Sequence, residues 1–171
     1  PYGLTSWGDL FTPRQLVALT TFSDLVGEAR ERIRRDAVAA GLPDDQMPLR
    51  DGGIGATAYS EAGNLYLSFA VSKALDRNTT LCTWEHRMDR MGHTFQRQAL
   101  PMTWDYVETN PLAGAGGDIY GTVGSLCEVL DKLVCGIPGT TSQVDATVQS
   151  VSAAKMVSTD PPYFDNIGYA D

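Results

Sequence analysis

The chain has 171 residues, a net charge of −8 and a hydrophobic fraction of 43%, which suits one globular domain with a buried core. The negative charge disfavours a protein that holds nucleic acid by phosphate attraction alone. No apolar run approaches the roughly 18 residues of a membrane span, and there is no signal-peptide pattern. The 3 cysteines are odd in number and lack zinc-site spacing, so we expect a reducing cytoplasm as the location.

The first predicted element is a helix that begins at Pro13. Thr12 is a good N-cap, and Gln15 completes a capping box. Apolar residues then recur at helical spacing until Gly41, where the helix is expected to end. Four arginines fall in its last turns: Arg30, Arg32, Arg34 and Arg35. We interpret them as a solvated helix face, with a phosphate-binding surface as the alternative.

Two further helices are predicted. The second starts at Ser60 and fades at Arg77 and Asn78. Its buried residues are expected to include Leu65, Phe69 and Ala70. The third is capped by Asp118 and stops at Gly136. Its apolar stripe consists of Ile119, Val123, Leu126, Cys127, Leu130, Leu133 and Val134, which makes Cys127 a core residue. After it, residues 144–148 alternate like a strand, and residues 155–159 are predicted to form a second strand.

Residues 84–106 interleave aromatic side chains with arginines, a pattern that suits contacts to nucleic acid. The candidate contacts are Arg97 and Trp104, together with Phe164 further along the chain. Acidic neighbours favour a packed loop for residues 84–106 instead. His86, His93 and Cys82 match no common zinc spacing, so no metal site is expected.

Two glycine clusters, residues 52–55 and 114–117, resemble loops that hold nucleotide-like cofactors. Neither follows a convincing strand, which is the context that gives such a loop meaning. We interpret both as flexible connectors. The chain is therefore expected to lack its own glycine-rich loop for a cofactor such as S-adenosylmethionine.

The tetrad Asp160-Pro161-Pro162-Tyr163 is the strongest functional motif. The exocyclic amine of adenine or cytosine is a poor nucleophile because its lone pair is delocalised, so a catalyst must accept hydrogen bonds from both amine protons. An ionised Asp160 supplies one acceptor and a backbone carbonyl the other. The two prolines fix the backbone and remove competing N–H donors. Tyr163 offers a flat face on which a flipped-out base can stack.

The same four residues also fit a plain turn at the end of a strand, because Asp-Pro and Pro-Pro are common in loops. Chance alone gives such a tetrad in about one of 10⁵ windows, which favours the functional interpretation.

Four segments of the chain resemble one protein family. The tetrad runs into Phe164-Asp165-Asn166-Ile167-Gly168-Tyr169-Ala170-Asp171, and the other segments are residues 7–16, 74–78 and 94–106. Together they resemble the large bacterial and archaeal adenine-specific DNA methylases, in which the tetrad runs into an aromatic-Asp-Asn-x-x-Tyr-Ala-Asp stretch. The similarity spans nearly the whole chain.

The resemblance implies an internal segment of a larger S-adenosylmethionine-dependent enzyme that methylates adenine N6 in DNA. Asp160 would accept a hydrogen bond from the target amine, the Pro161 carbonyl would accept a second, and Tyr163 would stack on the base. The cofactor loop would lie upstream and the rest of the sheet downstream, so we expect this chain alone to be inactive.

The expected fold class is α/β: a mostly helical segment plus one or two strands of a Rossmann-like methyltransferase sheet. Residues 1–138 would be an insertion or target-recognition region, and residues 139–171 part of the catalytic core. Two alternatives stay open. The helices could form an interaction module for DNA or another subunit, or the parent enzyme could methylate RNA or a protein amide.

Overall fold

The computed structural model describes residues 3–95, 100, 102–134, 136 and 139–160. In chain order the elements are η1 (Trp7–Leu10), α1 (Pro13–Ala39), η2 (Leu49–Asp51), α2 (Ala56–Leu75), β1 (Trp84–Glu85), β2 (Arg90–Met91) and α3 (Ile119–Lys132). The two strands pair antiparallel. The described residues are therefore mostly helical, as expected, but they contain no Rossmann-like parallel sheet.

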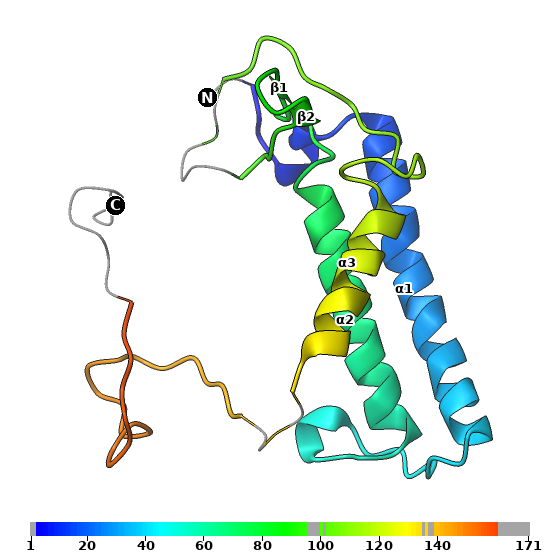
Figure 1. Ribbon diagram of the computed structural model, residues 1–171, viewed down its shortest axis with the longest axis vertical. Coiled ribbons are helices and arrows are strands. Elements are labelled where there is room, and N and C mark those ends of the chain that lie inside the picture. Colours follow the sequence, from blue (N-terminus) through cyan, green and yellow to red (C-terminus); the bar gives the residue numbers. More distant parts are fainter. Residues whose placement is uncertain (1–2, 96–99, 101, 135, 137–138, 161–171) are drawn as a thin grey trace. The chain divides into compact units, whose positions relative to one another are not determined.

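The α-helices of the described residues form one bundle (Figure 1). α1 and α2 lie side by side and run in opposite directions, and α3 packs against α2. The hairpin of β1 and β2 lies at the end of the bundle where α2 ends and where α1 and α3 begin. None of these helices has the length and apolar character needed to cross a membrane.

α1 begins and ends as predicted. The Thr12 N–H donates to Gln15 Oε1 (2.8 Å), and the Gln15 N–H donates to Thr12 Oγ1 (3.3 Å), which completes the capping box. Gly41 follows the helix with φ of 96°, and its N–H donates to the Val38 carbonyl (3.0 Å). Glycine suits this left-handed position because it has no Cβ.

Ion pairs hold part of the arginine-rich end of α1. Arg30 donates to Glu61 of α2 (2.8 Å), and Arg34 donates to Asp44 in the following loop (3.0 Å). The hydrogen bond and the charge of Asp44 raise the pKa of Arg34. Because carboxylates already partner Arg30 and Arg34, these two arginines are poor candidates for binding phosphate.

The connection from α1 to α2 is tighter than a flexible connector. A Cβ on Gly53 would lie 2.2 Å from the Met47 carbonyl oxygen, and a Cβ on Gly55 would lie 2.4 Å from the Pro43 carbonyl oxygen. The glycines of this cluster therefore let two stretches of backbone approach closely. α2 starts directly after Gly55, at Ala56 and not at Ser60 as predicted.

The predicted buried faces of the later helices are partly wrong. On α2, Ala70 is buried as expected, but Leu65 and Phe69 are 48% and 54% exposed. The buried side chains of α2 are small, which allows a close approach to α1. On α3, Asp118 precedes the first turn as expected, but Cys127 is exposed and is not a core residue. The apolar stripe of a helix can be wider than the face that one neighbouring helix covers, so residues at the edge of the stripe stay exposed.

The chain divides into two compact units, Pro1–Lys132 and Leu133–Asp171. In the second unit the predicted strands at residues 144–148 and 155–159 are wrong. Asp145 Oδ1 accepts from the N–H and the hydroxyl of Thr147 (2.8 and 2.7 Å), so a local turn replaces the first strand. The Lys155 N–H bonds to the Ser152 carbonyl (3.1 Å), and no described segment pairs with residues 155–159 as a strand.

Candidate functional site

The residues predicted to carry the chemistry are divided between the two units. Asp160 is exposed and lies outside any helix or strand. Trp104 belongs to the first unit, and its side chain is 93% exposed. The other predicted site residues lie outside the described part of the chain: Arg97, Pro161, Pro162, Tyr163 and Phe164. How these residues come together therefore stays a prediction.

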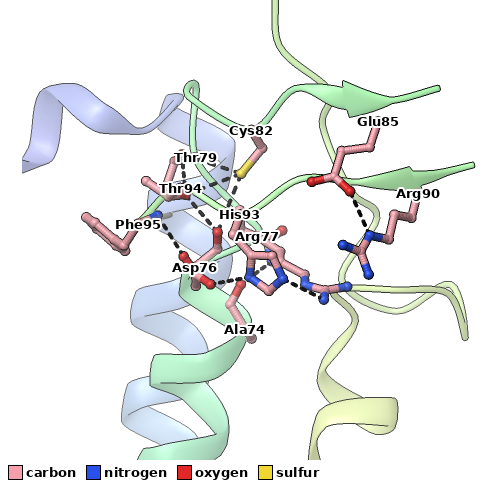
Figure 2. A network of polar contacts seen from close by, with 11 residues as sticks. Ala74, Asp76, Arg77, Thr79, Cys82, Glu85, Arg90, His93, Thr94 and Phe95 are labelled. Carbon is pink, nitrogen blue, oxygen red and sulfur yellow. Dashed lines mark hydrogen bonds and ion pairs between the residues drawn. The ribbon is translucent and has the colours of Figure 1, made fainter. Parts of the chain in front are cut away.

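The structure does bring together the other segments that carry the family resemblance. Described residues of 74–78 and 94–106 meet at the end of the bundle, around Asp76, the residue that follows α2 (Figure 2). The Asp76 carbonyl accepts from the N–H and the hydroxyl of Thr94 (2.8 and 2.7 Å). Its carboxylate accepts from the Phe95 N–H (3.0 Å) and lies 2.5 Å from His93 Nδ1. One residue of the 74–78 segment thus holds the start of the 94–106 segment.

A buried cluster of hydroxyl and thiol groups lies beside Asp76 (Figure 2). Thr94 Oγ1 is 2.8 Å from Thr79 Oγ1 and 3.3 Å from Cys82 Sγ, and all three residues are buried. Thr79 Oγ1 also accepts from the Leu81 N–H (3.0 Å). These contacts satisfy the polar groups of the turn after α2, and they give Cys82 a structural role.

His93 connects Asp76 to Arg77. Its Nε2 lies 3.0 Å from Arg77 Nη2, and its Nδ1 faces the Asp76 carboxylate. A guanidinium only donates hydrogen bonds, so Nε2 accepts and the ring proton sits on Nδ1. Both ring nitrogens are occupied, and the ring therefore orients Arg77. Among the described residues no group of His, Cys, Asp and Glu side chains forms a candidate metal site.

The 7–16 segment joins the same end of the bundle. The Leu10 carbonyl accepts from the N–H and the hydroxyl of Thr80 (2.8 and 3.0 Å). The Thr103 hydroxyl donates to the Thr80 carbonyl (3.2 Å), which adds the middle of the 94–106 segment. Leu10 itself is 2% exposed. Thr80, two positions beyond the 74–78 segment, thus joins Leu10 to Thr103 and extends the junction around Asp76.

An ion pair extends the junction to the start of α1. Arg14 Nε donates to Glu108 Oε1 (2.6 Å), and Arg14 Nη2 donates to Glu108 Oε2. The Thr12 hydroxyl donates to the same carboxylate (3.1 Å). The hydrogen bond from Arg14 lowers the pKa of Glu108, and the same contact raises the pKa of Arg14. The pair fixes the segment after Tyr106 against the N-terminal turn of α1.

The two glycine clusters differ in what surrounds them. In the first cluster, Gly53 and Gly55 are packed against carbonyl groups of their own loop, whereas Gly52 and Ile54 are exposed. In the second cluster, the buried Asp118 carboxylate accepts from the Gly114 N–H (3.0 Å) and the Gly121 N–H (2.7 Å). An acid at this helix start takes the place that an anionic ligand would need.

The role of Asp76, which holds residues 93–95 at the end of α2, was not predicted from the sequence. Residues 74–78 carry part of the family resemblance, but no role was predicted for Asp76. A helix-ending Asp-Arg-Asn was the available signal, and it does not reveal partners 17 to 19 positions away. No family model, no curated protein and no solved structure matches the chain. The function is therefore argued from its residues.

Proposed function

We propose that this chain is a segment of an S-adenosylmethionine-dependent methyltransferase that acts on the exocyclic amine of a DNA base, adenine N6 in the first place. The observation that supports the proposal is that described residues of 74–78 and 94–106 bond to one another through Asp76 and Thr94, and that Thr80 joins Leu10 of 7–16 to Thr103. These are the segments whose residues resemble the adenine-specific methylases outside the tetrad.

The tetrad supplies the chemical argument. Asp160 is exposed, so its carboxylate is free to accept a hydrogen bond from a target amine. The Pro161 carbonyl would accept the second amine proton, and Tyr163 would stack on the extruded base. When both protons of the exocyclic amine are held in hydrogen bonds, the electron density on the amine nitrogen rises. The nitrogen then becomes a better nucleophile towards the methyl group. The methyl donor would be held by residues outside those described here.

The test is methylation by the complete protein that contains this chain. DNA is incubated with the enzyme and S-adenosylmethionine, digested to nucleosides, and analysed for N6-methyladenine by mass spectrometry. We expect Asp160→Ala to abolish the product. Asp131→Ala, which removes an exposed carboxylate from α3, is the matched control and should retain full activity. Normal methylation by Asp160→Ala would refute the catalytic role of the tetrad.

A second measurement tests where the cofactor binds. Isothermal titration of this chain with S-adenosylmethionine should show no binding in the micromolar range, because neither glycine cluster has the preceding strand that a cofactor loop requires. Micromolar binding would contradict a cofactor site elsewhere in the parent protein. Such binding would not bear on the role of Asp160, which the methylation experiment tests separately.

A further inference from the structure

The imidazole ring of His93 lies between two groups of opposite charge at the end of α2 (Figure 2). Its Nδ1 is 2.5 Å from Asp76 Oδ2, and its Nε2 is 3.0 Å from Arg77 Nη2. The side chains of His93 and Asp76 are 35% and 28% exposed, so the ring can exchange protons with water. Histidine is the side chain that ordinarily changes its charge between about pH 5 and 8.

The contact with Arg77 requires a neutral ring. The guanidinium carries only hydrogen-bond donors, so Nε2 must offer a lone pair, and the ring proton lies on Nδ1, toward Asp76. A protonated ring carries a proton on each nitrogen. Its Nε2–H would then face a donor of Arg77, with a positive charge on both sides of the contact. Protonation of His93 therefore keeps the contact with Asp76 and breaks the contact with Arg77.

The charged groups of the neighbouring hairpin and turn have partners of their own. In the hairpin, Arg90 Nε donates to Glu85 Oε2 (2.8 Å). In the turn after α2, the Cys82 thiol contacts the Asp76 carbonyl, at 3.6 Å, and not the ring of His93. Among the described residues, the charges that contact the imidazole are therefore Asp76, which favours the charged ring, and Arg77, which disfavours it.

Arg77 forms a wall that two cavities share. One cavity, of about 430 Å³, is also lined by Lys73 of α2 and by Asp118 before α3. The other, of about 330 Å³, is also lined by Arg90 of the hairpin. Among the described residues, the guanidinium of Arg77 has no hydrogen bond besides the one to His93. The state of the His93 ring therefore decides whether this guanidinium is held in place.

We propose that His93 is a pH-dependent switch for the position of Arg77. At neutral pH the uncharged ring accepts a hydrogen bond from Nη2 and holds the guanidinium at the wall of both cavities. On acidification the ring becomes charged, stays bound to Asp76 and releases Arg77, which changes the shape and charge of both cavities together. The inference rests on these contacts and does not depend on the proposed methyl transfer.

The test is an NMR titration of the chain from about pH 7.5 to about pH 5, a range in which histidine ordinarily changes its charge and carboxylates do not. The signals of the His93 ring and of the Arg77 side chain should shift with the same midpoint. The Gly116 amide should follow them, because a Cβ on Gly116 would lie 3.4 Å from Arg77 Nη1. Relaxation of the Arg77 side-chain signals should show greater mobility at the acidic end, which a change of charge without release would not produce.

His93→Gln is the decisive variant, because it removes the titrating ring. We expect the signals and the mobility of Arg77 to stay constant over the same pH range in this variant. His86→Gln is the matched control: it removes the other histidine of the chain, which is exposed in the turn of the hairpin, and should leave the Arg77 titration unchanged. Circular dichroism should show the same helix content in both variants. Arg77 signals that stay constant while the His93 ring of the unaltered chain titrates, or that titrate equally in His93→Gln, would overturn the proposal.

Discussion

The carbonyl and the carboxylate of Asp76 together accept hydrogen bonds from Thr94 and Phe95 and contact His93. Asp76 directly follows α2, where the last carbonyls of a helix lack partners within the helix. An acidic residue at this position is electrostatically unfavourable for the helix dipole. We infer that its contacts to residues 93–95 compensate for this, and that Asp76 is placed there for the junction.

Thr94 allows the energy of the junction to be measured. Thr94→Val keeps the shape of the side chain but removes a buried hydroxyl that bonds to the Asp76 carbonyl and contacts Thr79. We expect a loss of about 0.5–1.5 kcal/mol in unfolding free energy, because the Asp76 carbonyl and the Thr79 hydroxyl each lose one of their hydrogen bonds. Urea unfolding followed by circular dichroism gives the value. Thr20→Val, on the exposed face of α1, should change it by less than about 0.5 kcal/mol. Equal effects of both variants would contradict a structural role for the cluster.

Glu108 gives the junction a pH dependence. Arg14 holds the pKa of this carboxyl below its usual value of 4.5. A lowered folded pKa means that the stabilisation is fully present above the usual value and is lost as the pH falls through the lower folded value. We expect Glu108→Gln to be less stable than the unaltered chain at pH 7, and the difference to shrink on acidification below 4.5.

Thermal melts of both chains across this pH range provide the measurement. High salt should reduce the difference at pH 7, because Arg14 is largely exposed and its charge is screened. A difference between the two chains that stays constant from neutral to acidic pH would contradict this account.

At the scale of elements, the signals that could be recognised in the sequence were local ones. The caps of α1 at Thr12 and Gly41 and the start of α3 after Asp118 depend on neighbours within a few positions. The strand expected at residues 144–148 failed because a strand needs a partner, whereas the Asp145 turn needs only Thr147. The exposure of Leu65 and the role of Asp76 also depend on distant segments. These could not be read from spacing alone.

The turn between α1 and α2 contains a sharp test of close backbone packing. Gly53→Ala would place a methyl group 2.2 Å from the Met47 carbonyl oxygen, so the backbone must shift. We expect a destabilisation of about 1–3 kcal/mol. Gly27→Ala is the matched control within α1, where an added Cβ meets nothing within 4 Å. Alanine should stabilise this helix by about 0.5–1 kcal/mol. The melting temperature should therefore fall for Gly53→Ala and rise for Gly27→Ala. Shifts of the same sign in both variants would contradict the close packing at Gly53.

At the scale of the whole molecule, the two units differ in what holds them together. The first has packed helices and a junction whose hydrogen bonds join residues such as Leu10 and Thr80. In the second, the hydrogen bonds among residues 139–160 span at most four positions. Its described side chains are exposed except for Gln149 and Ser152, which are partly covered. Few buried contacts mean a low free energy of local opening.

Limited proteolysis should therefore separate the units. Thermolysin cuts beside apolar residues, and the exposed ones at residues 139–160 are Val144, Val148, Val151, Met156 and Val157. We expect the first cuts there, because a protease needs a locally opened backbone. The surviving fragment should contain Pro13–Ala39, Ala56–Leu75 and Ile119–Lys132, and should keep the helical circular dichroism of the intact chain. Mass spectrometry of the early products identifies the sites. First cuts within α1 or α2 would show that the bundle opens as easily as residues 139–160. That result would contradict the division into a packed first unit and a loosely held second unit.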